Sequence, residues 1–445
     1  MLIVRKVVEY LEERPRASFD TDIDKHNKKK AVLTPLLSAS ECWRMAALES
    51  ICDNCRLTFN YASKSFEVEF PAWPASFPYL RLPKSHLIKQ VVVPLHLWRT
   101  MYGGAFCEAL ATVQYENLSF PCANTLVLLL SKDSTDGATG AAPVVDQEKV
   151  IDFARMLLQL TPAVSAASIK VLNLNAGVPS YAQLYDVLVS ELYKGRVTGM
   201  EIHPAPGFSS LPFSLQGVSG LTSIGHNLNF SWGPFASLAY RNARTLKTLD
   251  IRIAEETNWL DLIYGGTETP AVYDSLTSLL LVTAYTAYGT TWTAIEGGVV
   301  PFPSLEILRV AGRYPFDDDL FFRGNGSTLQ HLRIPFSALA RNILGRFGVL
   351  KRSGVTQMDR IDIYEVDKVD EDFMHGKDLR PIGQQVHRIL EVATSFSLDN
   401  DTEDFPMHNA IYLAPNTAII KHLRLYSIGC LMIELLNVIA HIPSL

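Results

Sequence analysis

The chain has 445 residues, of which 48% are hydrophobic and 19% are charged. A composition this apolar excludes a disordered chain and predicts a large buried core. The 40 basic and 46 acidic residues give a net charge of −6, which excludes a protein built as a whole to wrap nucleic acid. Six cysteines are too few for a disulfide scaffold, so we expect reduced thiols in a cytoplasmic or nuclear protein.

Three stretches bear on membrane targeting. Charged side chains spread through residues 1–15 leave no uncharged apolar run for a signal peptide. Residues 202–240 and 275–295 carry no Asp, Glu, Lys or Arg, but the first holds several Pro and Gly and the second holds six threonines. Because a membrane-spanning helix needs about 20 predominantly apolar residues, we expect neither a signal peptide nor a spanning segment.

The N-terminal elements are helical by their pattern. Aliphatic residues recur at helical spacing near the start, a polar stretch follows to residue 30, and residues 33–48 then hold a leucine-rich turn and the run Cys42, Trp43, Arg44. Over residues 1–58 this arrangement resembles an F-box. It departs from that family because the opening Leu-Pro is missing and the polar stretch is longer than usual.

The F-box resemblance implies a partner. Its helices would bind a Skp-type adaptor through an apolar surface made by Leu2, Ile3, Val7, Leu11, Leu37 and Trp43. The alternative is a small helical cap that covers the open end of the first repeat, in which case the same side chains are buried against the protein. The apolar pattern alone does not choose between these two interpretations.

Residues 59–165 form an irregular joining region or a set of early repeats. Alternating residues at 56–61 and 66–70 predict strands, as do the apolar runs at 91–97 and 125–130. Residues 131–142 are rich in Asp, Gly, Ser and Thr and predict a loop. Residues 147–160 have the periodicity of an amphipathic helix.

A repeat occupies the rest of the chain, residues 166–445. The template is an aliphatic residue followed by two more at the fourth and sixth positions, which places the last two on one face of a short strand. It matches from Ile169, Val197, Leu246, Leu276, Leu305, Leu329, Met358 and Ile420, and imperfectly from Leu221 and Ala393. Residues 181–193 and 335–350 have helical spacing and would return the chain between strands.

This tract resembles leucine-rich repeats. The resemblance implies an α/β solenoid, with a curved parallel sheet and with helices and loops on its outer face. The Asn or Cys that regularly follows the strand in that family is absent, which implies a less regular curve. The concave inner face of such a solenoid is the surface expected to bind a partner.

The outward positions of the predicted strands give the candidate binding residues. They are Asp250, Arg252, Arg309, His331, Arg333, Arg360, Asp362, Tyr364, His422 and Arg424. Three arginines, at 309, 333 and 360, come from consecutive strands and could share one ribbon, because neighbouring strands lie about 4.8 Å apart. Such a basic patch predicts an acidic or phosphorylated partner. The alternative is a solvated face on which the two aspartates neutralise the arginines.

Motifs for catalysis and for cofactors are not found. The sequence has no Walker A, HExxH, GxSxG or GxGxxG pattern, and Cys52 and Cys55 form a CxxC without a second pair at zinc-ribbon spacing. Asp317, Asp318 and Asp319 are consecutive, whereas a calcium loop alternates its carboxylates. We therefore expect no metal, no cofactor and no enzyme; an enzyme would have to use Asp250, His331 or Asp362 on the inner face.

The resemblances together predict a function. The chain would be the substrate-recognition subunit of an SCF-type ubiquitin ligase, with the N-terminal helices on a Skp-type adaptor and an unidentified target protein on the repeat face. Two binding surfaces on one body would raise the effective concentration of target lysines near the ubiquitin donor. The alternative is a repeat-only interaction scaffold with a helical cap.

Overall fold

The computed structural model of the chain describes part of its residues. These are 31–60, 65–71, 85–95, 119–131, 147–172, 179–194, 197–203, 215, 217–226, 232–253, 260–283, 300–312, 328–335, 358–364, 389, 392–399 and 421–426. The expected first helix and the expected helix at 335–350 lie almost wholly outside these ranges, as do the three consecutive aspartates. The chain divides into two compact units, unit 1 with residues 1–218 and unit 2 with residues 219–445.

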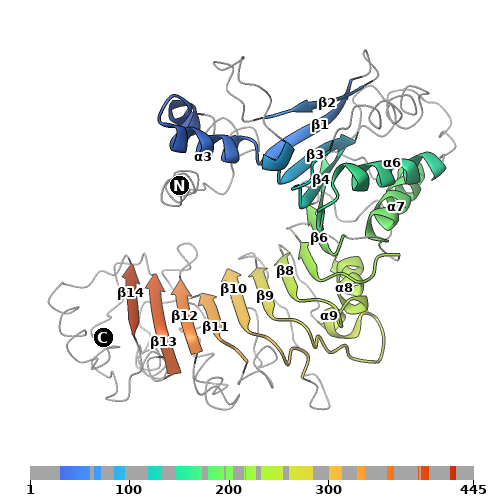
Figure 1. Ribbon diagram of the computed structural model, residues 1–445. Helices are drawn as coiled ribbons and strands as arrows, with labels where there is room; N and C mark the ends of the chain where they lie inside the picture. Colours follow the sequence, from blue (N-terminus) through green and yellow to red (C-terminus); the bar gives the residue numbers. More distant parts are fainter. Residues whose placement is uncertain are drawn as a thin grey trace, which may run out of the picture. The chain divides into compact units, whose positions relative to one another are not determined.

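Unit 1 begins, in its described part, with helical residues 31–37 and helix α3 (Glu41–Ile51). Its strands are β1 (Asn54–Asn60), β2 (Ser65–Glu69), β3 (Gln90–Leu95), β4 (Thr125–Ser131), β5 (Ala166–Leu172) and β6 (Gly199–His203), with a 3-10 turn η1 (Ser85–Leu87). Helices α6 (Gln147–Leu160) and α7 (Pro179–Tyr193) confirm the predicted helical stretches and lie together beside the strands (Figure 1).

The strands of unit 1 follow the order β2-β1-β3-β4-β5-β6. Only the β1–β2 pair is antiparallel; the others are parallel. A parallel neighbour requires the chain to return to the starting edge, and α6 and α7 provide that return for β4 to β5 and β5 to β6.

Unit 2 continues the pattern with strands in chain order. They are β7 (Ser223–His226), β8 (Thr248–Ile253), β9 (Ser278–Thr283), β10 (Ile307–Gly312), β11 (His331–Pro335), β12 (Met358–Tyr364), β13 (Ala393–Asp399) and β14 (His422–Tyr426). All printed pairs are parallel. Helices α8 (Trp232–Arg241) and α9 (Leu260–Tyr264) lie near β8 in Figure 1.

The fold is therefore α/β with long, mostly parallel sheets whose strands follow the chain order except at β1 and β2, in keeping with the predicted repeat pattern. The fourth template position aligns from strand to strand: Leu249 pairs with Leu279, then Leu308, Leu332, Ile361, Phe396 and Leu423. Most of these side chains are fully buried. Each repeat thus buries its apolar face against its neighbours, which is how a solenoid obtains a continuous core.

A backbone arrangement recurs with the same period. The carbonyl of the residue after the first template aliphatic accepts two N–H groups from the next repeat: Thr222 O accepts from Lys247 and Thr248, at 2.7 and 3.1 Å. The Lys247 carbonyl accepts in turn from Thr277 and Ser278, both at 3.0 Å. This arrangement fixes the register of each strand on the previous one independently of the side chains.

The same arrangement favours early repeats, one of the two alternatives for the joining region, and extends them back to β1. Asp53 O accepts from Lys89 and Gln90, both at 2.8 Å, so the first repeat starts at Cys52. The template positions of unit 1 mix aliphatic residues with cysteine and alanine; for example, Cys55 aligns with Val91, and Leu126 with Ala167. The triplet Ile88, Val91 and Val93 is fully aliphatic, whereas the triplets before and after it begin with Cys52 and Ala123.

One predicted template match is wrong in phase. The match that starts at Ile169 treats this residue as the first position, but Ile169 pairs with Ile202, which is a sixth position. The true triplet of β5 is Val164, Ala167 and Ile169, all buried. A chain this apolar offers several overlapping triplets, and only the pairing with neighbouring strands selects one.

Candidate protein-binding face

The sheet of unit 2 has one apolar face and one polar face. In β11, Leu332 and Ile334 are buried, whereas Arg333 between them is exposed and His331 is half-exposed. Because successive side chains of a strand point to opposite faces, all ten predicted binding residues lie opposite the core. We call this surface the polar face; it is formed by Asp250, Arg252, Arg309, His331, Arg333, Arg360, Asp362, Tyr364, His422 and Arg424.

The strand register corrects the predicted arginine ribbon. Arg309 pairs with Arg333 as expected, but the next member of that row is Asp362. Arg360 instead pairs with His331, in the neighbouring row. In this register Leu332 pairs with Ile361, which places Arg360 two residues before the position that the ribbon required.

Asp362 is the centre of a polar cluster on this face. Its carboxylate lies 3.0 Å from His331 Nε2 and accepts a hydrogen bond from Arg360 Nε at 2.9 Å. A carboxylate only accepts, so Nε2 of His331 carries the proton in this contact. Burial by itself would raise the pKa of Asp362, but the hydrogen bonds from His331 and Arg360 and their charges outweigh it, so its pKa lies below the usual range.

Arg333 is held in a different way. Its guanidinium lies over the ring of Tyr364, 4.6 Å from the ring centroid. Tyr364 is buried, and its hydroxyl donates a hydrogen bond to the backbone carbonyl of Val310 on β10. The ring is thus fixed to a strand two positions away, and it provides a rigid base for the guanidinium.

The other charges of the face divide into paired and unpaired ones. Arg252 forms an exposed ion pair with Asp250, at 3.4 Å. Arg309 and Arg424 are exposed, and within the described ranges no carboxylate lies within ion-pair distance of either. The predicted neutralisation by the two aspartates therefore applies to Arg252 and Arg360 but leaves other cations of the face available.

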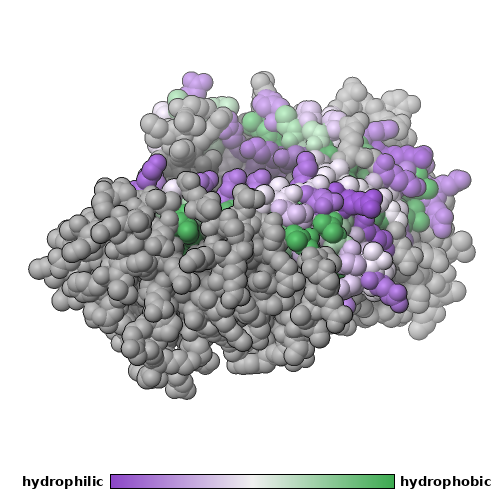
Figure 2. All heavy atoms as spheres, turned by 90° about the horizontal axis from the view of Figure 1, so that it is seen from below, coloured by the Kyte–Doolittle hydropathy of each residue, from purple (hydrophilic) through white to green (hydrophobic). Residues whose placement is uncertain are grey.

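Apolar side chains border Arg309 on the polar face. Leu280 pairs with Arg309 in the register, and Ile307 precedes Arg309 by two residues on the same face; both are half-exposed. Neither residue was among the ten predicted binding residues, although their alternation with buried leucines indicated that they lie on the polar face. Figure 2 shows hydrophilic side chains over most of the described surface in that view, with apolar side chains in small separate spots.

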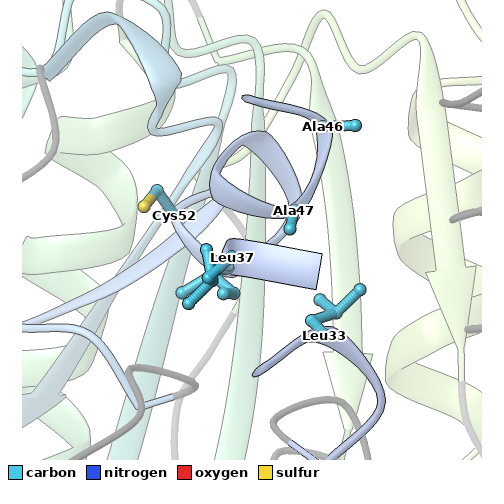
Figure 3. Packing of buried hydrophobic residues seen from close by; sticks show 6 residues of the cluster. Leu33, Leu37, Ala46, Ala47 and Cys52 are labelled. Carbon is cyan, nitrogen blue, oxygen red and sulfur yellow. The ribbon is translucent and has the colours of Figure 1, made fainter. Parts of the chain in front are cut away.

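The N-terminal helical residues form their own small core. Leu33, Leu37, Ala46, Ala47, Ile51 and Cys52 are buried together, and Trp43, Phe70 and Leu87 pack partly against them. Figure 3 shows this cluster around α3. Leu37 is only 3% exposed, and Cys52 belongs to the first repeat. Leu37 is buried in the same cluster as Cys52, and Trp43 is partly buried against it; Leu2, Ile3, Val7 and Leu11 lie outside the described residues.

The CxxC motif belongs to the core. Cys52 and Cys55 occupy the first and fourth template positions of the first repeat, and both are fully buried. Burial raises the pKa of the Cys55 thiol to about 12, which disfavours the thiolate that metal binding and redox exchange require. In the part of the chain that the structure describes, no three His, Cys, Asp or Glu side chains are placed to hold a metal ion. No helix among these residues is long and apolar enough to cross a membrane.

Comparison with known proteins adds no family to this geometry: neither the protein-family models nor the curated proteins include a match to the sequence. The two resemblances, to an F-box and to leucine-rich repeats, therefore stay predictions.

Proposed function

We propose that the chain works by binding: the polar face of unit 2 holds a partner protein while the repeats keep that face rigid. The observation that carries this proposal is the contrast between the two faces of the same strands. Exposed Arg309 and Arg333 alternate with fully buried Leu308 and Leu332. A polar face of this kind, extended over parallel neighbouring strands, is the type of surface that solenoids use for partners.

The proposal is tested by removing the charge of the face. Affinity purification from cells would compare the wild type with the double variant Arg309→Glu, Arg333→Glu and with the control Arg155→Glu, which reverses an exposed arginine on α6. We expect at least one protein to be recovered in near-equimolar amount with wild type and control and to be lost with the double variant. Recovery of the same proteins by all three chains would refute the proposal.

A second candidate function is the one that the F-box resemblance implies, a substrate-recognition subunit of an SCF-type ubiquitin ligase. The observation that favours it is the exposure of α3: Glu41, Cys42 and Arg44 are exposed and Trp43 is half-buried. These side chains could contact a Skp-type adaptor. Leu37, which is buried, would instead hold the helical residues in place, so its predicted direct role at the adaptor is not part of this proposal.

The adaptor proposal is tested with two exposed cysteines. Cys42→Arg places a long cation on α3, and Cys122→Arg makes the same change at an exposed turn before β4. If the adaptor binds at α3, a pull-down of purified Skp-type adaptor should succeed with wild type and Cys122→Arg and fail with Cys42→Arg. An adaptor that binds none of the three chains, or all of them equally, would count against this role.

A further inference from the structure

Two arginines of the polar face form a pair. Arg309 on β10 and Arg333 on β11 are register partners, so their backbones are about 4.8 Å apart. Both are exposed. The two neighbouring arginines with carboxylate partners, Arg252 and Arg360, are ion-paired at 3.4 and 2.9 Å. No such partner lies within ion-pair distance of Arg309 or Arg333 among the residues that the structure describes.

The cluster at Asp362 explains why the pair is not neutralised. Asp362 is the register neighbour of Arg333, but the hydrogen bonds to its two oxygens come from His331 and Arg360, which hold the carboxylate toward the neighbouring row. Arg333 turns to the Tyr364 ring instead. A guanidinium that stacks through its flat face keeps its N–H donors in the plane of the group, where they remain able to bind an anion. Among the residues that the structure describes, the Arg333 guanidinium therefore has an aromatic partner but no carboxylate partner.

The charge of the pair indicates the kind of anion. Two guanidinium groups carry +2 and offer more donors than one carboxylate can accept. A phosphorylated side chain carries about −1.5 to −2 at neutral pH and has three strong acceptor oxygens, so it can be shared by two arginines. Leu280, the register partner of Arg309, and Ile307 on the same face add apolar contact area next to the pair.

We propose that Arg309 and Arg333 bind a phosphorylated side chain of the partner protein, and that Leu280 and Ile307 contact an apolar residue beside it. This inference rests on the proposed function, because it names the chemistry that the polar face recognises. It predicts that partner binding depends on phosphorylation and weakens at high salt, since exposed charges are screened.

The test uses the full chain and three fluorescent peptide libraries. Each library has one fixed central residue, either phosphoserine, serine or glutamate, followed by leucine and flanked by mixed residues. Fluorescence anisotropy gives the apparent Kd for the wild type, for the double variant Arg309→Gln, Arg333→Gln, and for the control Arg155→Gln. Far-UV circular dichroism and urea unfolding verify that both variants keep the fold, which we expect because all three arginines are exposed.

We expect the phosphoserine library to bind wild type and control at least tenfold more tightly than the serine and glutamate libraries, and the double variant to lose this preference. Equal binding of the glutamate and phosphoserine libraries, or a preference that survives in the double variant, would overturn the inference. If the serine library binds the wild type as tightly as the phosphoserine library and the double variant binds neither, the proposed function stands but recognition of a phosphate group is refuted. The absence of binding by every library would also refute the phosphate.

Discussion

The two units use one repeat in two ways. Their apolar faces are equivalent, since the fourth template position is buried in both: Val91 and Leu126 in unit 1, Leu308 and Leu332 in unit 2. Their other faces differ. In unit 1 the middle of the row between the core positions holds Val92, Val127 and Ser168, which are 8%, 2% and 3% exposed. At the two ends of this row, Arg56 is half-buried and Glu201 is exposed. In unit 2 the same row holds the exposed Arg309, Arg333 and Arg424, with the buried Asp362 and Ser397 between Arg333 and Arg424.

This difference separates stability from recognition. A strand buried on both faces is apolar at nearly every position, as in parallel sheets covered on both sides. A strand with one exposed face alternates, and its outward residues are free to vary with function. Strands β3 to β5 of unit 1 therefore have the character of a scaffold in this row, whereas β10, β11 and β14 of unit 2 present exposed arginines there.

The largest effect concerns the cysteines that replace leucines in the first repeat. We expect Cys52 and Cys55 to react with a maleimide at least about a thousandfold more slowly than the exposed Cys42 and Cys122, because burial blocks access and disfavours the thiolate. Mass spectrometry of the native protein, read cysteine by cysteine, measures the rates. Comparable rates would show that Cys52 and Cys55 are not buried in the way that the corresponding residues of later repeats are.

A matched pair in β9 tests which face is core in unit 2. Leu279 is fully buried and Leu280, its neighbour, is half-exposed on the polar face. Leu279→Ala should lower the free energy of unfolding by about 3 kcal/mol, through lost burial and the cavity left behind. Leu280→Ala should cost less than about 1 kcal/mol. Urea unfolding followed by circular dichroism measures both, and equal costs would contradict the alternation.

The Asp362 cluster gives a pH-dependent effect. Asp362→Asn should cost about 1–3 kcal/mol of unfolding free energy at pH 7, since it removes a carboxylate hydrogen-bonded to His331 and Arg360. Folding lowers the pKa of this group. Its contribution is therefore complete above the unfolded-state pKa of about 3.9 and is lost as the pH falls through the lower folded-state pKa.

Urea unfolding of the wild type and Asp362→Asn, at pH 7 and near pH 3, measures this dependence. The difference between the two proteins should shrink at the lower pH. Asp359→Asn is the control, because this exposed carboxylate lies on the same strand and should change little at either pH. A cost that stays constant with pH would mean that the charge of Asp362 does not stabilise the fold.

A smaller effect on stability distinguishes the strand faces that lie opposite the core in the two units. Val127→Thr in unit 1 places a hydroxyl in a buried site without changing the shape of the side chain, and it should cost about 1–3 kcal/mol of unfolding free energy. Val282→Thr makes the same change at a half-exposed position of the polar face and should stay within about 0.5 kcal/mol. Similar values from chemical denaturation would remove the distinction between the two rows.

The smallest effect is expected at the helix surface of unit 1. Glu191 on α7 accepts from Lys194 at 2.8 Å and from Arg155 of α6 at 3.3 Å, and the hydrogen bond from Lys194 and then the nearby charges lower its pKa. The two cations are 69% and 61% exposed. Glu191→Gln should therefore cost under about 1 kcal/mol in thermal or urea unfolding. A cost as large as that of Asp362→Asn would place this contact among the main stabilising ones.

For most strands of unit 2, the amino-acid sequence alone predicted the strand and the face that each of its residues occupies. A period of two within each strand follows from the backbone, so the alternation of Leu308, Arg309 and Val310 predicted the core and the polar face together. The sequence also predicted helices α6 and α7, because a stripe of apolar residues at helical spacing extends over several turns of each.

The residues that align between repeats, and the charged side chains that contact each other, depend on the folded structure. The hydrogen bonds between strands decide which residue is the first position of each repeat. The start of the repeat at Cys52 and the true triplet of β5 could therefore be assigned only from the strand pairing. The same holds for the polar face, where the register placed Asp362 beside Arg333 and moved Arg360 to His331. Contacts between strands far apart in sequence depend on register, and a single chain pattern contains no direct record of it.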